Sequence, residues 1–107
     1  MSTDLVASFW DTHNKDLLSL VDKTESLLKA SEKKTNIIKS VFGKNSEEYL
    51  NISNEIAQIS MACLVDAYNK FGDRLNVYRY PRDYEKVLDQ QKRIKWLFEK
   101  IDTLEMD

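Results

Sequence analysis

The sequence predicts an all-α protein, an antiparallel bundle of three long helices that forms a single domain over residues 1–107. In three long stretches, apolar residues recur every three or four positions, which is the spacing of a helix that packs on other helices. Only two glycines and one proline occur in 107 residues, too few for the many turns of a strand-based fold. The length allows one hydrophobic core but not two. If the first helix is broken, the bundle has four helices.

The first helix is expected to begin at Ser2, a favoured N-cap residue, and to end before Gly43. A continuous helix of this length would extend about 60 Å at 1.5 Å per residue, which exceeds the other two helices. We therefore expect a break or kink in one of two polar segments, residues 13–16 or residues 31–36. The apolar stripe of this helix is expected to contain Val6, Trp10, Leu17, Leu20, Leu27, Ile38 and Val41.

The second helix is expected to begin at Asn45 or Ser46 and to stop at Gly72. With Asn45 as the N-cap, Glu48 stands three residues later, where a capping box requires a carboxylate. The inward-facing residues of this helix are expected to be Tyr49, Ile52, Ile56, Ile59, Cys63 and Ala67, with Phe71 alongside.

The third helix is expected to begin near Pro81, because proline suits the first turn of a helix. Residues 73–80 form the connector that precedes it. The connections around Gly43 and Gly72 are short, so consecutive helices should run antiparallel. Gln91 interrupts the third apolar stripe, which is expected to contain Tyr84, Val87, Leu88, Ile94, Leu97, Phe98, Ile101 and Leu104.

Composition predicts a soluble, cytoplasmic protein without a membrane partner. Residues 1–8 lack the basic start and apolar centre of a secretory signal peptide. The longest apolar run, residues 61–65, is far shorter than the roughly 20 residues that cross a bilayer. Cys63 is the only cysteine and cannot form a disulfide within the chain, so nothing indicates an oxidising compartment.

The sequence predicts no active site, no metal and no cofactor. His13 is the only histidine, and it has no neighbours at the spacing of metal ligands. Cys63 lies among apolar residues, where a thiol serves as a small hydrophobic side chain rather than as a nucleophile. Two isolated glycines cannot form a phosphate-binding loop. We therefore expect a protein that is not an enzyme.

The clearest candidate for recognition of a partner protein is residues 78–84, at the end of the connector. This segment contains Tyr78, Arg79, Tyr80, Arg82 and Tyr84. Tyrosine and arginine are enriched at binding hot spots, because both offer a large contact area and a polar group. Two interpretations are open: these side chains contact a partner, or the tyrosines fix the connector to the bundle.

Residues 74–100 contain eight of the sixteen basic residues but only four of the eighteen acidic residues. Basic residues among aromatic ones suggest an alternative function, regulation through nucleic-acid binding. However, Lys92, Arg93 and Lys95 point in different directions around a helix, and the sequence pI near 5.4 is low for a dedicated nucleic-acid binder. A solvated helix surface is the simpler interpretation.

A second surface is predicted for self-association. Residues 61–65 are apolar all round the second helix, which is more than two neighbouring helices ordinarily cover. A tryptophan beside a phenylalanine also widens the apolar surface of each outer helix. A dimer would bury this surplus, whereas a well-filled monomer core is the alternative. The expected interface residues are Met61, Leu64, Val65, Trp10 and Trp96.

These features predict a non-enzymatic helical protein-interaction module, which is a small adaptor, regulator or inhibitor that binds another protein and forms a homo-oligomer. Nucleic-acid binding by residues 74–100 is the alternative. The two hypotheses differ in their response to salt, because phosphate contacts weaken steeply as salt rises and apolar contacts hardly change.

Overall fold

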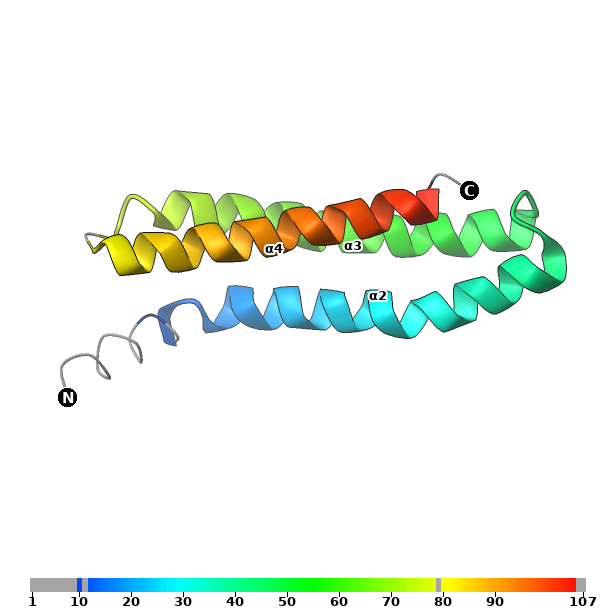
Figure 1. Ribbon diagram of the computed structural model, residues 1–107, viewed down its shortest axis with the longest axis horizontal. Coiled ribbons are helices and arrows are strands. Elements are labelled where there is room, and N and C mark those ends of the chain that lie inside the picture. The colour runs from blue at the N-terminus through cyan, green and yellow to red at the C-terminus, as the bar shows by residue number, and fades with distance from the viewer. Residues whose placement is uncertain (1–9, 11, 79, 106–107) are drawn as a thin grey trace.

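The computed structural model describes residues 10, 12–78 and 80–105, and this part of the chain contains three long helices (Figure 1). Helix α2 spans Lys15–Phe42, α3 spans Glu47–Arg74 and α4 spans Pro81–Glu105. Consecutive helices run antiparallel, and together they form a rod with principal extents of 56 × 22 × 16 Å. The predicted all-α bundle of three antiparallel helices is confirmed.

The first helical stretch is broken at Asn14, within the first of the two segments where a break was expected. Trp10, Thr12 and His13 have helical backbone, Asn14 departs from it with φ −106° and ψ 9°, and α2 begins at Lys15. The backbone bonds continue across this point, because the Asn14 N–H donates to the Trp10 carbonyl and the Asn14 carbonyl accepts from Leu18. The expected helix start at Ser2 lies outside the described residues.

The second candidate segment, residues 31–36, stays helical. The Thr35 hydroxyl lies 2.9 Å from the Ser31 carbonyl and 3.0 Å from the Glu32 carbonyl, to which it donates. Such a bond to the preceding turn satisfies the hydroxyl and bends a helix slightly. Figure 1 shows α2 curving toward α3 over its last turns.

The buried face of α2 differs from the predicted stripe. Leu27 and Val41 were expected to face inward, but 39% of Leu27 and 69% of Val41 is exposed to solvent. The buried positions are Leu17, Val21, Thr24, Leu28 and Thr35. The predicted apolar stripe contained neither Thr24 nor Thr35. In the structure, the hydroxyl of each threonine donates a hydrogen bond to the carbonyl four residues earlier in the same helix, so both side chains can face the core.

Ser46 is the N-cap of α3, so the capping box expected from Asn45 and Glu48 does not form. The Ser46 hydroxyl accepts a hydrogen bond from the Tyr49 N–H at 3.1 Å, which satisfies one free donor of the first turn. Gly43 ends α2 as predicted. Its φ of 96° is a conformation that residues with a Cβ rarely adopt.

Gly72 does not stop α3, which continues to Arg74. A Cβ atom at Gly72 would lie 3.3 Å from the Gln91 amide nitrogen, so this glycine marks a close approach of α3 and α4. The same amide donates to the Tyr68 carbonyl at 3.2 Å. Gln91 thus interrupts the apolar stripe of α4 because it forms a polar bond between the helices.

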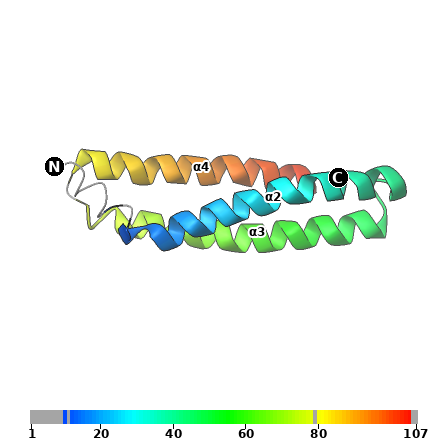
Figure 2. The same cartoon turned by 90° about the horizontal axis from the view of Figure 1, so that it is seen from below.

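Helix α3 is the central element of the fold, because it packs along both α2 and α4, whereas α2 and α4 touch at few points. Figure 2 shows α2 crossing α3 obliquely while α3 and α4 stay side by side. The core follows α3 and contains Trp10, Leu17, Val21, Leu28, Ile56, Ala57, Leu64, Ala67, Phe71, Val87, Ile94, Leu97 and Ile101. Because α2 and α4 touch at few points, a groove remains between them.

Candidate functional site

Tyr78, the first residue of the predicted recognition segment, fixes the connector to the bundle. Its hydroxyl accepts a hydrogen bond of 2.6 Å from the side-chain amide of Asn14, which is fully buried. Its ring meets the His13 ring edge to face, with the centroids 6.0 Å apart. The Asn14 amide also donates to the Trp10 carbonyl at 2.9 Å. Tyr78 therefore has the structural role that was one of its two interpretations.

Arg74 extends this network to the start of α2. Its guanidinium donates to the His13 carbonyl and to the Asn14 side-chain oxygen, each at 3.0 Å. It also pairs with the Asp16 carboxylate at 3.2 Å. Hydrogen bonding from Arg74 lowers the pKa of the Asp16 carboxyl, and burial opposes this effect. Together these bonds join the start of α2, the end of α3 and the connector; we call them the Asn14 network.

The rest of the predicted recognition segment lies closer to solvent. Tyr80 is 61% exposed and Tyr84 is 42% exposed, whereas Arg82 is half-buried with its guanidinium 3.9 Å from the Asp83 carboxylate. Arg79 lies outside the described residues. The segment therefore divides into a structural residue, Tyr78, and exposed residues that are available to a partner.

The basic residues between 74 and 100 are spread over several faces, and most of them contact the bundle itself. Arg74 and Arg93 form ion pairs with carboxylates of α2. The ammonium groups of three lysines lie over aromatic rings, at 5.1 Å from Trp10, 5.8 Å from Tyr68 and 4.2 Å from Trp96, and these lysines are Lys86, Lys95 and Lys100. This arrangement is not the single basic face on which phosphate binding depends.

The residues predicted for self-association also divide. Leu64 is fully buried and Trp10 is only 4% exposed, so both belong to the core of the single chain and offer no surface to a second one. The expectation for these two residues is corrected, because α3 is covered from two sides by α2 and α4. Met61 packs partly against the core. Val65 and Trp96 remain exposed, Trp96 at 46%.

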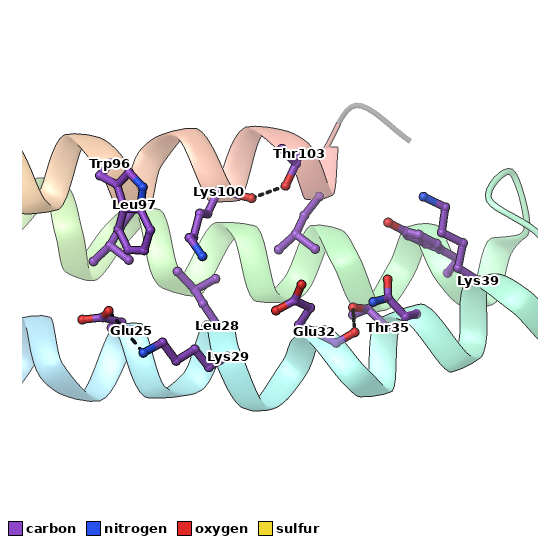
Figure 3. A pocket seen from close by; sticks show the side chains of 13 residues that line it. Glu25, Leu28, Lys29, Glu32, Thr35, Lys39, Trp96, Leu97, Lys100 and Thr103 are labelled. Atoms are coloured by element: carbon purple, nitrogen blue, oxygen red, sulfur yellow. Dashed lines mark hydrogen bonds and ion pairs between the residues drawn. The ribbon is translucent and has the colours of Figure 1, made fainter.

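A groove with a volume of about 320 Å³ lies between α2 and α4 (Figure 3). Figure 3 shows Leu28 and Glu32 pointing from α2 toward α4, and Lys100 pointing from α4 toward α2. Tyr49 of α3 contributes to the lining, and Trp96 stands at the α4 wall. We call this feature the α2–α4 groove; its remaining lining residues are Glu25, Lys29, Thr35, Asn36, Lys39, Leu97, Thr103 and Leu104.

An ion-pair cluster closes one end of the α2–α4 groove. The Arg93 guanidinium of α4 bonds to the carboxylates of Asp22, at 2.7 Å, and Glu25 on α2. Hydrogen bonding from Arg93 lowers the pKa of the Glu25 carboxyl, and burial opposes this effect. Lys29 lies 3.6 Å from the same carboxylate. This cluster holds α2 and α4 together at one level, and beyond it the two helices leave the groove open.

The α2–α4 groove was not predicted from the sequence. Its α2 wall is the polar series Glu25, Lys29, Glu32 and Asn36, spaced four, three and four residues apart. Such a series on a helix is usually a solvated face. The sequence contained one indication of the groove: around the axis of α2, this polar series lies next to the buried residues Leu28 and Thr35.

Three further findings bear on the function of the site. Among the described residues, no group of three or more His, Cys, Asp or Glu side chains is placed to hold a metal ion. Within the same part of the chain, no helix combines the length and hydropathy that crossing a membrane requires. No family model, curated protein or solved structure matches the chain.

Proposed function

We propose that this chain is a non-enzymatic protein-interaction module, a small adaptor, regulator or inhibitor that acts by binding another protein and that self-associates. The observation that carries the proposal is the α2–α4 groove, an open channel bordered by the half-exposed ring of Trp96. Grooves lined by aromatic and apolar side chains together with a few polar groups are typical binding sites.

The occupant that this groove fits best is an amphipathic helix of the partner protein. Both walls are helices, and the α2 wall extends from residue 25 to residue 39, about 21 Å at 1.5 Å per residue. A partner helix of about four turns would match that length and insert apolar side chains at helical spacing. Tryptophan at a groove wall is a typical hot-spot residue.

The charges of the groove favour an acidic partner helix. Three lysines line it against two glutamates, which leaves a net charge of +1; Glu25 is bound to both Arg93 and Lys29, and the other lysines are Lys39 and Lys100. Complementary charge at the rim of an interface mainly raises the association rate and the specificity.

The proposal is tested by capture from the native host followed by direct binding. Proteins retained by the chain are identified, purified, and titrated against it at about 0.05 M and 0.5 M salt. A protein partner held by apolar contacts should lose little affinity over this range, whereas nucleic-acid binding would fall by orders of magnitude.

The role of the groove in this complex is tested with a matched pair of variants. Trp96→Ala should weaken binding by about 2 kcal/mol, roughly 30-fold. Val65→Ala, which also shortens a half-exposed apolar side chain but lies outside the groove, should leave binding unchanged. Recovery of nucleic acid alone, or of no protein that binds the purified chain, would refute the proposed function.

A further inference from the structure

A second open surface lies on the side of the α2–α3 pair that faces away from α4. On α3, Tyr68 and Gly72 contact Gln91 of α4. At 100° per residue, three half-buried or exposed residues of α3 lie on the opposite side of this helix from those contacts. On α2, three more lie opposite the lining of the α2–α4 groove. We call these six residues the α2–α3 face: Leu20, Leu27, Ile38, Ile52, Ile59 and Cys63.

All six residues of the α2–α3 face are apolar, and the described helices cover this face only in part, where Leu20 and Ile52 pack against the core. Ile59 is 50% exposed and Leu27 is 39% exposed, and the other four are half-buried. The steps between them are seven and eleven residues on α2 and seven and four residues on α3, which keep the side chains on one side of each helix. The face therefore has the pattern of a helix-packing surface without its partner.

We propose that the α2–α3 face binds the same face of a second copy of this chain, about a two-fold axis parallel to the helices. The inference rests on the self-association included in the proposed function and names its surface. The charges beside the face select this occupant. Exposed lysines, Lys23 and Lys34, flank it on α2, and exposed carboxylates, Glu55 and Asp66, flank it on α3.

The register of the two helices places these charges at matching levels. Lys39 lies over the Tyr49 ring, and Asp16 pairs with Arg74. In the antiparallel pair of α2 and α3, two residues at the same height along the helix axes therefore have residue numbers whose sum is about 89. Lys34 is then level with Glu55, and Lys23 with Asp66. The apolar face separates these four charges within one chain, where Asp66 pairs with Lys70 of its own helix at 3.0 Å and the Asp16–Arg74 pair joins α2 to α3 beyond the end of the face.

A two-fold axis parallel to the helices brings the opposite charges together. It lays α2 of each copy on α3 of the other and keeps each residue at its own level. Lys34 then meets Glu55 of the second copy, and Lys23 meets Asp66, each twice. An axis across the helices would instead lay α2 on α2 and set the lysine edges against each other, which like-charge repulsion disfavours.

The size of the face indicates a weak dimer. From residue 20 to residue 38 it is about 27 Å long, and two adjacent helices are about 20 Å wide. Each copy would thus bury roughly 550 Å², or about 1,100 Å² in total, close to the lower limit of specific interfaces. Dissociation in the micromolar range is expected for such an area.

Sedimentation equilibrium of the full chain between about 10 μM and 1 mM tests the proposal. The wild type should show a monomer–dimer equilibrium, and Ile59→Lys should weaken it at least roughly 30-fold, as for a hot-spot residue. Lys34→Glu should weaken the dimer about tenfold, and adding Glu55→Lys should restore it, because the two charges are exchanged. Circular dichroism of each variant verifies that it is folded.

Three results would overturn the proposal. A chain that remains monomeric at about 1 mM would remove both the dimer and the proposed self-association. A dimer that Trp96→Ala dissociates and Ile59→Lys does not would keep self-association but move it to the α2–α4 groove. A charge exchange at Lys34 and Glu55 that fails to restore the dimer would refute the axis. Partner binding is measured separately, so its outcome is independent of these three.

Discussion

Replacing Asn14 by alanine tests whether the Asn14 network holds the N-terminal break and the connector together. The substitution removes three side-chain hydrogen bonds, to the Trp10 carbonyl, the Tyr78 hydroxyl and the Arg74 guanidinium. Neutral bonds contribute about 1 kcal/mol each and a bond to a charged group about 1.5–3 kcal/mol. Their sum is therefore about 4 kcal/mol before compensation.

Two of the groups that lose a bond keep other partners, which lowers the cost. The Trp10 carbonyl still accepts from the backbone N–H of residue 14, and Arg74 still bonds to Asp16 and to the His13 carbonyl. We expect a net loss of about 2 kcal/mol, which lowers the melting temperature of a domain of this size by roughly 8–16 °C.

Thermal denaturation of Asn14→Ala, Tyr78→Phe and the double variant measures this loss. Tyr78→Phe removes only one bond and should cost about 1 kcal/mol in the free energy of unfolding. In the Asn14→Ala background the same change should cost almost nothing, because its bond is already absent. Equal effects of Tyr78→Phe in both backgrounds would show that this hydrogen bond does not stabilise the fold.

Further expected outcomes concern the connector, acid and a turn. Tyr80→Ala and Arg82→Ala should each weaken partner binding by about 2 kcal/mol if these residues contact the partner, and a lowered melting temperature with unchanged affinity would make them structural. Glu25 has a lowered pKa in the folded state, so its ion pair stabilises fully above the unfolded pKa of about 4.5, and this stabilisation is lost as pH falls through the lower folded pKa. In Glu25→Gln, the melting temperature should fall less on acidification than it does in the wild type. A fall equal to that of the wild type would contradict the stabilising role of this ion pair. Gly43→Ala should lower the melting temperature by roughly 4–8 °C, because φ is 96° there and such a conformation costs about 1 kcal/mol; an unchanged value would refute the strain.

The fold could be predicted because its strongest determinants are local. Apolar spacing, the scarcity of turn residues and Pro81 at the start of α4 all act within a few residues of the chain. The break at Asn14 was also within reach, since the polar segment around it interrupts an otherwise apolar stripe. Gly72 was misread because its role is a close approach to Gln91 of another helix, which no local pattern contains.

The site could be predicted only in part, because exposure depends on which helix lies in the middle. Leu64 looked like surplus apolar surface, but α3 is covered by both other helices and buries this residue completely. Tyr78 looked like its exposed neighbours, but it pairs with Asn14, which lies 64 residues earlier. The α2–α4 groove lies between two helices that are not consecutive in the chain and touch at few points, and sequence spacing carries no information on how closely such helices pack.

Helix α2 has two different surfaces, and they should work independently. Its groove side, around Lys29 and Glu32, faces α4, whereas Leu27 lies on the opposite side with the α2–α3 face. A partner helix in the groove and a second copy on the α2–α3 face would therefore not compete for the same side chains. Trp96→Ala and Ile59→Lys lie on different helices and in different surfaces, so their effects on the two binding reactions should be additive. Partner affinity measured on the monomeric Ile59→Lys variant should equal that of the wild-type chain; a large loss would mean that the partner binds only the dimer.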